Sequence, residues 1–143
     1  MALILALLEH SEQHAQVRAS LEQAGHEVLV VDSFARAKKV LRVHSFDLII
    51  SDAHLENGGS VFDFLRWVKD DPASNQTPFV LFSMKPSPLA KYLADGVLTT
   101  ARVFGAAKYI IMTPFDAAAF TQEIAEVLPP PGTAVPNYSY EGR

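Results

Sequence analysis

The chain has 143 residues, of which 49% are hydrophobic and 20% charged, and its formal net charge is −4. This composition is typical of one packed globular domain, and the negative charge gives no electrostatic reason to expect direct binding of nucleic acid, whose phosphates are held chiefly by Lys and Arg. The sequence has no cysteine, which excludes disulfides and thiolate sites, and we expect a cytoplasmic protein. The first apolar run, Ala2 to Leu8, is too short to span a bilayer, so it predicts a buried strand and no membrane association.

Short apolar runs alternate with longer amphipathic segments along the chain, which is typical of βαβ units around a parallel sheet. Each run is too short for a helix and rich in Val, Ile, Leu or Phe, as strands buried on both faces are. The five predicted strands are Leu3 to Leu8, Glu27 to Val31, Asp47 to Ser51, Phe79 to Ser83 and Tyr109 to Met112. The pattern therefore predicts an α/β fold with a doubly wound five-stranded parallel sheet.

The helical segments between these runs carry recognisable start and stop signals. Polar residues suited to N-caps open four of them, namely Ser11, Ser33, Ser60 and Asp116. Gly25 lies where the C-cap of the first helix would fall, and Pro129-Pro130-Pro131 forbids continuation of the last helix. We therefore predict one domain over residues 1–128 and a proline-rich, extended or disordered tail over residues 129–143, which could alternatively serve as a docking peptide.

Asp52 is the leading candidate for a functional residue. It closes the apolar run that starts at Phe46, and the turn-like segment Glu56-Asn57-Gly58-Gly59 comes after it. Open α/β sheets place their chemistry at the C-terminal ends of the strands. Asp52 is therefore a candidate nucleophile or metal ligand.

These features together resemble the receiver domain of response regulators in two-component signalling, from about Leu3 to Leu128. The run ending in Asp52 matches the family's third strand, which ends in the phosphoacceptor aspartate, and Ser83 stands where the family has Ser or Thr. The segments Gly105 to Tyr109 and Thr113 to Asp116 are similar to its fifth-strand region. The resemblance implies the flavodoxin-like (βα)5 receiver fold.

The resemblance also implies a role for each site residue. Asp52 would accept a phosphoryl group from a phosphohistidine donor, Ser83 would contact that group, and Tyr109 would act as a switch residue. Glu9, Asp52 and the backbone carbonyl of His54 would bind Mg²⁺. The His54 side chain could either promote hydrolysis of the aspartyl phosphate or shield the pocket.

The chain departs from the family at the metal site. Leu8 and Glu9 stand where the family has two acids, or Glu9 and His10 if the register shifts by one residue. In either register Glu9 is the sole acid at this position. We therefore expect a weakened Mg²⁺ site.

A second departure removes the cation that the family places before the proline of the fifth-strand region. Met112 or Thr113 stands in its place. Lys85 or Lys108 could reach toward the site, although ordinary solvated lysines are the alternative. The missing ammonium puts both phosphoryl transfer and switching in doubt.

Two functions remain open, and neither is a conventional enzyme activity. The first is a receiver-like domain of a phosphorelay that is phosphorylated on Asp52 by a sensor histidine kinase or phosphotransfer protein and regulates a downstream partner. The second is an atypical, phosphorylation-independent pseudo-receiver that acts as a protein-interaction module. The predicted loop and short helix from Met84 to Thr100 would tune the partner or form a homodimer. Flavin or nucleotide binding is disfavoured, because Glu9 and Glu12 after the first strand would repel phosphate.

Overall fold

The computed structural model describes residues 2–8, 11–52, 61–83, 102–112 and 115–128. Five parallel strands form one sheet in the order β2-β1-β3-β4-β5. They are β1 (Leu3–Leu7), β2 (Glu27–Val31), β3 (Leu48–Asp52), β4 (Phe79–Ser83) and β5 (Lys108–Ile111). The strand order reverses between β1 and β3, which creates a topological switch point at their carboxyl ends. The predicted doubly wound α/β fold is confirmed, with strand limits that differ from the prediction by at most one residue.

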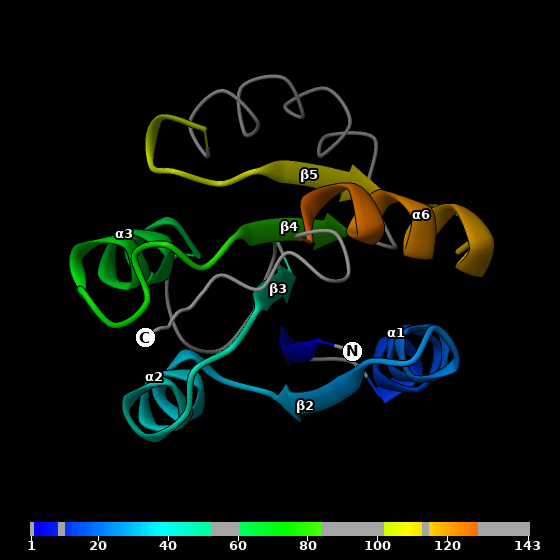
Figure 1. The fold of residues 1–143 in the computed structure, drawn as a ribbon, viewed down its shortest axis with the longest axis horizontal. Helices are drawn as coiled ribbons and strands as arrows, with labels where there is room; N and C mark the ends of the chain where they lie inside the picture. The colour runs from blue at the N-terminus through cyan, green and yellow to red at the C-terminus, as the bar shows by residue number, and fades with distance from the viewer. Residues whose placement is uncertain (1, 9–10, 53–60, 84–101, 113–114, 129–143) are drawn as a thin grey trace, which may run out of the picture.

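Helices cover both faces of the sheet (Figure 1). α1 (Ser11–Gln23) and α6 (Ala117–Val127) lie on one face, and α2 (Phe34–Val43) and α3 (Val61–Asp70) lie on the other. Alternate strand residues therefore enter two different cores. Ile4 packs with the α1/α6 side, whereas its neighbour Leu5 packs with the α2/α3 side.

Local capping explains where α1 stops. Gly25 has a φ of 94°, a left-handed conformation that glycine adopts without strain. The Gly25 N–H donates to the Glu22 carbonyl and the His26 N–H to the Leu21 carbonyl, both at 3.0 Å. These two bonds form a Schellman motif, so the predicted stop signal is confirmed.

Two of the predicted N-caps have the expected geometry. The Ser33 hydroxyl accepts a hydrogen bond from the Arg36 amide at 3.2 Å, and the Asp116 carboxylate accepts one from the Ala119 amide at 3.1 Å. α1 begins at Ser11 itself. Ser60 lies outside the described residues.

A lysine joins the end of α3 to the connection that enters β4. The Lys69 ammonium donates to the backbone carbonyl of Thr77 at 2.7 Å and to that of Asn75 at 3.2 Å. Burial lowers the pKa of this amine. The Lys69 stem also fills the space beside Gly105, where a Cβ would lie 3.1 Å from it.

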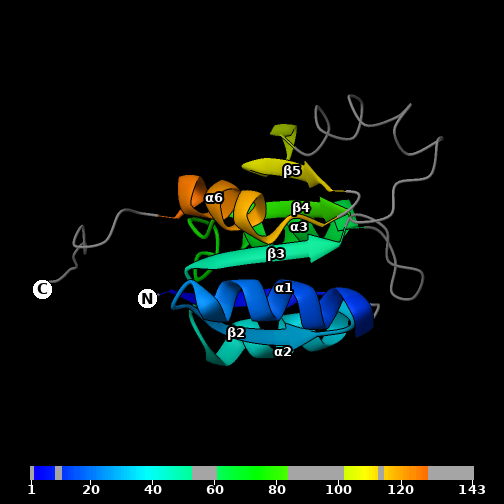
Figure 2. The same ribbon diagram turned by 90° about the vertical axis from the view of Figure 1, so that its right-hand side faces the viewer.

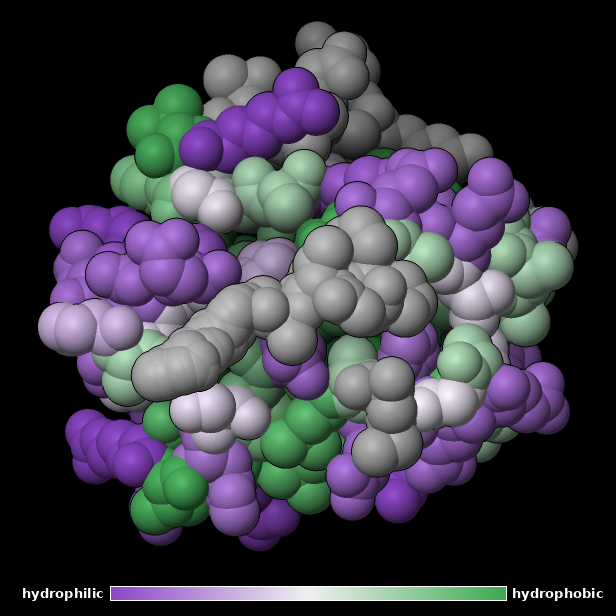
Figure 3. Space-filling model, in the orientation of Figure 1, coloured by the Kyte–Doolittle hydropathy of each residue, from purple (hydrophilic) through white to green (hydrophobic). Residues whose placement is uncertain are grey.

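The outer surface shown in Figure 3 is mostly hydrophilic, with smaller apolar areas between the polar side chains. Among the described residues, the exposed large apolar side chains are Leu29, Val43 and Val103. They belong to three different segments, and scattered apolar residues of this kind are ordinary on a protein surface. None of the helices in the described part of the chain is both long and apolar enough to cross a membrane.

α6 is the last element that the structure describes. The Leu128 N–H caps α6 by donating to the Ile124 carbonyl. The predicted tail over residues 129–143 lies outside the described residues, and so does the predicted loop and short helix from Met84 to Thr100.

Candidate functional site at the carboxyl edge of the sheet

Asp52 lies at the carboxyl end of β3, beside the point where the strand order reverses. The strands are all parallel, and Figure 2 shows the arrows of β2, β3, β4 and β5 pointing toward this edge. Its side chain is buried, with 4% of the residue exposed, and the Ser51 hydroxyl donates to the Asp52 backbone carbonyl at 3.1 Å. A carboxylate held at the rim of an apolar sheet can act as a nucleophile or a metal ligand.

Ser83 ends the neighbouring strand and is also buried. The Cα partner of Asp52 on β4 is Phe82, so Ser83 lies one residue further toward the edge. Its carbonyl accepts a hydrogen bond from the Met112 amide at 2.9 Å, which fixes the start of the segment after β5. The two side chains predicted to handle the phosphoryl group thus end adjacent strands.

Tyr109 lies on β5, on the same face of the sheet as Ser83. The register pairs Tyr109 with Leu81 and Ile111 with Ser83, and paired residues in a parallel sheet point to the same face. The Tyr109 ring packs against the α2/α3 core. Its hydroxyl oxygen is buried and has no hydrogen-bond partner in the part of the chain that the structure describes.

The environment of Tyr109 favours the neutral phenol. Burial, followed by the negative charge of Asp52, raises the pKa of this side chain. The hydroxyl oxygen itself is shielded from water.

Leu8 brings an apolar side chain to the end of β1. It is fully buried in the α1/α6 core, and its amide donates to the Val31 carbonyl at 3.0 Å. Glu9 and His54 lie outside the described residues. Within the described ranges no group of three or more His, Cys, Asp or Glu side chains could hold a metal ion.

Met112 occupies the position directly after β5. The register places Ile110 beside Phe82 and Phe82 beside Asp52, so Met112, two residues after Ile110, belongs to the same face as Asp52. The Met112 side chain packs against the α1/α6 core. An apolar side chain therefore stands here, while Thr113 lies outside the described residues.

Lys108 does not replace the missing cation. Its ammonium lies 2.8 Å from the Glu123 carboxylate and also contacts Glu126, both on α6, and hydrogen bonds to these two acids raise its pKa. Its Cα partner is Val80, three residues before Ser83. The idea that Lys108 reaches the site is therefore wrong, and Lys85 lies outside the described residues.

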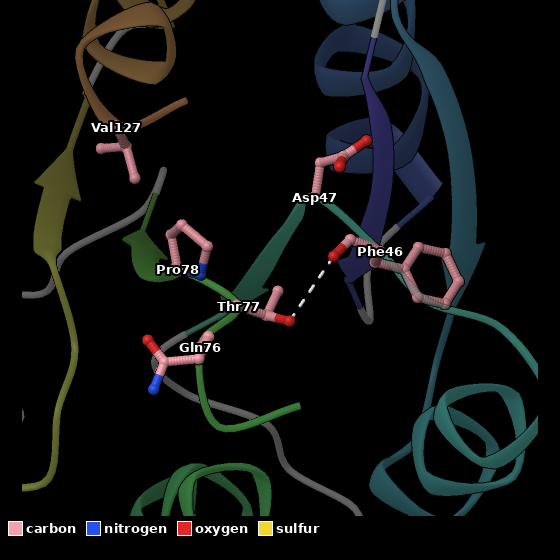
Figure 4. A pocket seen from close by; sticks show the side chains of 6 residues that line it. All are labelled: Phe46, Asp47, Gln76, Thr77, Pro78 and Val127. Carbon is pink, nitrogen blue, oxygen red and sulfur yellow. Dashed lines mark hydrogen bonds between the residues drawn. The ribbon is translucent and has the colours of Figure 1, made fainter. Parts of the chain in front are cut away.

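A pocket of about 490 Å³ lies at the opposite, amino edge of the sheet (Figure 4). Phe46, Asp47, Gln76, Thr77, Pro78 and Val127 line it. The Thr77 hydroxyl donates to the Phe46 carbonyl at 3.5 Å, and the Asp47 carboxylate accepts a hydrogen bond from the Leu3 amide at 2.8 Å. Asp47 thus joins β1 to the start of β3, and the pocket is separate from the Asp52 site.

Comparison with known proteins gives structural matches only. No protein-family model matches the chain, and no curated protein matches it. Among solved structures, the chemotaxis response regulator CheY4 of Vibrio cholerae matches with a TM-score of 0.74 and 24% identity, over 90% of this chain and 99% of that one. The receiver domain of a signal transduction histidine kinase from Syntrophus aciditrophicus matches with a TM-score of 0.74 and 20% identity, over 98% and 100%.

A third match has a metal in its site. It is the receiver domain of the sensor histidine kinase PA1611 from Pseudomonas aeruginosa, with a magnesium ion coordinated in the active site cleft. Its TM-score is 0.71 and its identity 16%, over 88% of this chain and 96% of that one. The chain therefore has the fold of response-regulator receiver domains, and the predicted resemblance is confirmed at the level of the fold.

Proposed function

We propose that the chain is a receiver-like signalling domain that accepts a phosphoryl group on Asp52 and thereby regulates a partner protein. The observation that carries this proposal is the buried carboxylate of Asp52 at the switch point of a receiver fold, with Ser83 at the end of the adjacent strand. The donor would be a sensor histidine kinase or a phosphotransfer protein. We also expect this role to involve a downstream partner protein, and the domain could form a homodimer.

The transfer requires little covalent chemistry from the protein. A carboxylate oxygen of Asp52 forms a bond to phosphorus while the bond from phosphorus to the donor imidazole nitrogen breaks, and that nitrogen takes up a proton. Negative charge spreads over the three remaining phosphoryl oxygens during this step. The Ser83 hydroxyl, at the end of the adjacent strand, would donate a hydrogen bond to one of them.

Mg²⁺ fits this proposal, although with fewer protein ligands. Asp52 would hold it together with Glu9 and the backbone carbonyl of His54, and the bound ion would neutralise phosphoryl charge. Mg²⁺ usually keeps several waters and needs only one or two carboxylates. Leu8 contributes none, so the affinity would be lower than at a site with a further acid.

A pseudo-receiver is the second candidate, and two observations favour it. Leu8 is buried in the core, and Met112 packs against the same core, where charged groups would otherwise support phosphoryl transfer. In this alternative the domain binds its partner without phosphorylation.

Intact-mass analysis after incubation with acetyl phosphate and Mg²⁺ separates the two candidates. We expect one phosphoryl adduct on the wild-type chain and none on Asp52→Asn, with a slower rate for Ser83→Ala. Thr77→Val is the matched control, because it removes a hydroxyl at the opposite edge. No adduct on the wild type, either with acetyl phosphate or with phosphoramidate, would reject the phosphoacceptor and leave the pseudo-receiver.

A further inference from the structure

The hydroxyl of Tyr109 is a buried polar group whose presence packing alone does not explain. Its ring is held in the α2/α3 core, yet its oxygen is shielded from water without a hydrogen-bond partner among the described residues. Buried polar groups in folded proteins are nearly always paired, and the exceptions often have a catalytic role or await a ligand. Phenylalanine would fill the same volume without leaving a donor unpaired.

Tyr109 lies near the carboxyl edge of the sheet, where Asp52 also lies. Neighbouring strands lie about 4.8 Å apart, so the β3 and β5 backbones are separated by roughly 10 Å across β4. Tyr109 is two residues before Ile111, the partner of Ser83, and strand side chains lean along the strand direction. Asp52, whose partner on β4 is Phe82, belongs to the opposite face, so a phenol on β5 and an aspartyl phosphate on β3 can meet only past the carboxyl end of β4, beside Ser83.

The electrostatics of the two groups support the same approach. Burial, followed by the charge of Asp52, raises the pKa of Tyr109, as expected if the two groups lie near each other. A neutral phenol keeps its proton and can donate it to an anionic oxygen. On the α1/α6 face, Met112 carries no charge that could reach Asp52. Lys108 is held in ion pairs with Glu123 and Glu126.

We propose that the Tyr109 hydroxyl donates a hydrogen bond to a phosphoryl oxygen carried by Asp52, and so supplies part of the stabilisation that neither Met112 nor Lys108 provides. This role rests on the proposed phosphorylation of Asp52. It differs from ring movement, because it depends on the hydroxyl alone. Hydrogen bonds to charged oxygens in a buried site are stronger than neutral ones, and removing one such donor can slow a reaction by about 10²-fold or more.

The test compares Tyr109→Phe with the wild type, because this change keeps the ring and deletes the hydroxyl. We expect adduct formation from acetyl phosphate to slow by at least about tenfold. We also expect weaker binding of beryllium trifluoride, a phosphoryl mimic, measured from its bound ¹⁹F resonances. Thr77→Val controls for loss of a hydroxyl elsewhere and should change neither readout.

A second background tests the link to the missing cation. If the hydroxyl compensates for that cation, Tyr109→Phe should cost less in Met112→Lys than in the wild type, as a double-mutant cycle would show. If Met112→Lys fails to fold, the comparison of Tyr109→Phe with the wild type still tests the role of the hydroxyl.

The outcomes separate the two proposals. Equal adduct rates and equal beryllium trifluoride affinities for Tyr109→Phe and the wild type would overturn the Tyr109 role while leaving Asp52 as the acceptor. No adduct on any variant would overturn both.

Discussion

Replacing Tyr109 by phenylalanine should stabilise the unphosphorylated protein. The ring keeps its place in the α2/α3 core, while a buried hydroxyl without a described partner is removed. Leaving such a group unsatisfied costs about 1–3 kcal/mol. We take the lower end, because the rest of the residue is only partly buried, and expect the free energy of unfolding to rise by about 1 kcal/mol.

Urea denaturation followed by circular dichroism measures this change, and a thermal melt should show a midpoint about 3–5 °C higher. The pH dependence gives an independent check. Burial and the Asp52 charge raise the pKa of Tyr109 above its usual value of 10.0. Above pH 10 the unfolded state therefore loses this proton before the folded state does, and the wild type loses stability there. Tyr109→Phe should lack that loss.

A lower stability of Tyr109→Phe would refute the idea that the hydroxyl is unsatisfied in the resting protein. If Tyr109→Phe unfolds at a lower urea concentration with an unchanged slope, the hydroxyl has a stabilising partner in the resting protein. The expected pair of effects, higher stability and slower phosphorylation, is the trade-off found where a site holds a strained or unsatisfied group for function.

Three further predictions concern the scaffold. Gly25→Ala should lower the free energy of unfolding by about 1 kcal/mol in urea titrations, because the space is open but φ is 94°. Lys69→Met should cost about 1–2 kcal/mol by the same assay, since two carbonyls lose their donor; Lys39→Met, an exposed matched control, should not. The His26 pKa is lowered mainly by burial, so stability should fall below pH 6.5, by less in His26→Gln; parallel wild-type and variant curves would contradict this.

The sequence predicts the parts of the fold that depend on local patterns. Strands β1 and β3 are continuous apolar runs because both of their faces are covered, and such runs are legible without knowing their neighbours. Ser33, Asp116 and Gly25 are predictable as caps because a cap depends on hydrogen bonds within a few residues. The predicted β5 is displaced by one residue because a charged Lys108 does not read as a strand residue, although its backbone completes the ladder with β4.

The candidate site can be predicted only in part. Asp52 and Ser83 are found at strand ends because each closes an apolar run. The partners of Lys108 and the burial of the Tyr109 hydroxyl depend on how α6 and α3 lie over the sheet, which no local pattern specifies. The one sequence feature that indicates the ion pairs of Lys108 is the spacing of Glu123 and Glu126, which places two acids on one side of a helix.

Side-chain alternation connects the two departures from the receiver pattern. Leu8 directly follows β1 and Met112 directly follows β5, and both pack with the α1/α6 core. The two positions where the receiver pattern has charged groups therefore belong to one apolar region at the carboxyl edge. A charge introduced at Leu8 would lie against that core, which is strongly unfavourable, whereas Met112→Lys would place its ammonium on the same face as Asp52. The opposite face of the same edge keeps its hydroxyls, on Ser83 and Tyr109. Asp52 thus lies between an apolar side, formed by Leu8 and Met112, and a side that carries the hydroxyls of Ser83 and Tyr109. We expect the hydroxyl-bearing side to stabilise the proposed phosphoryl group.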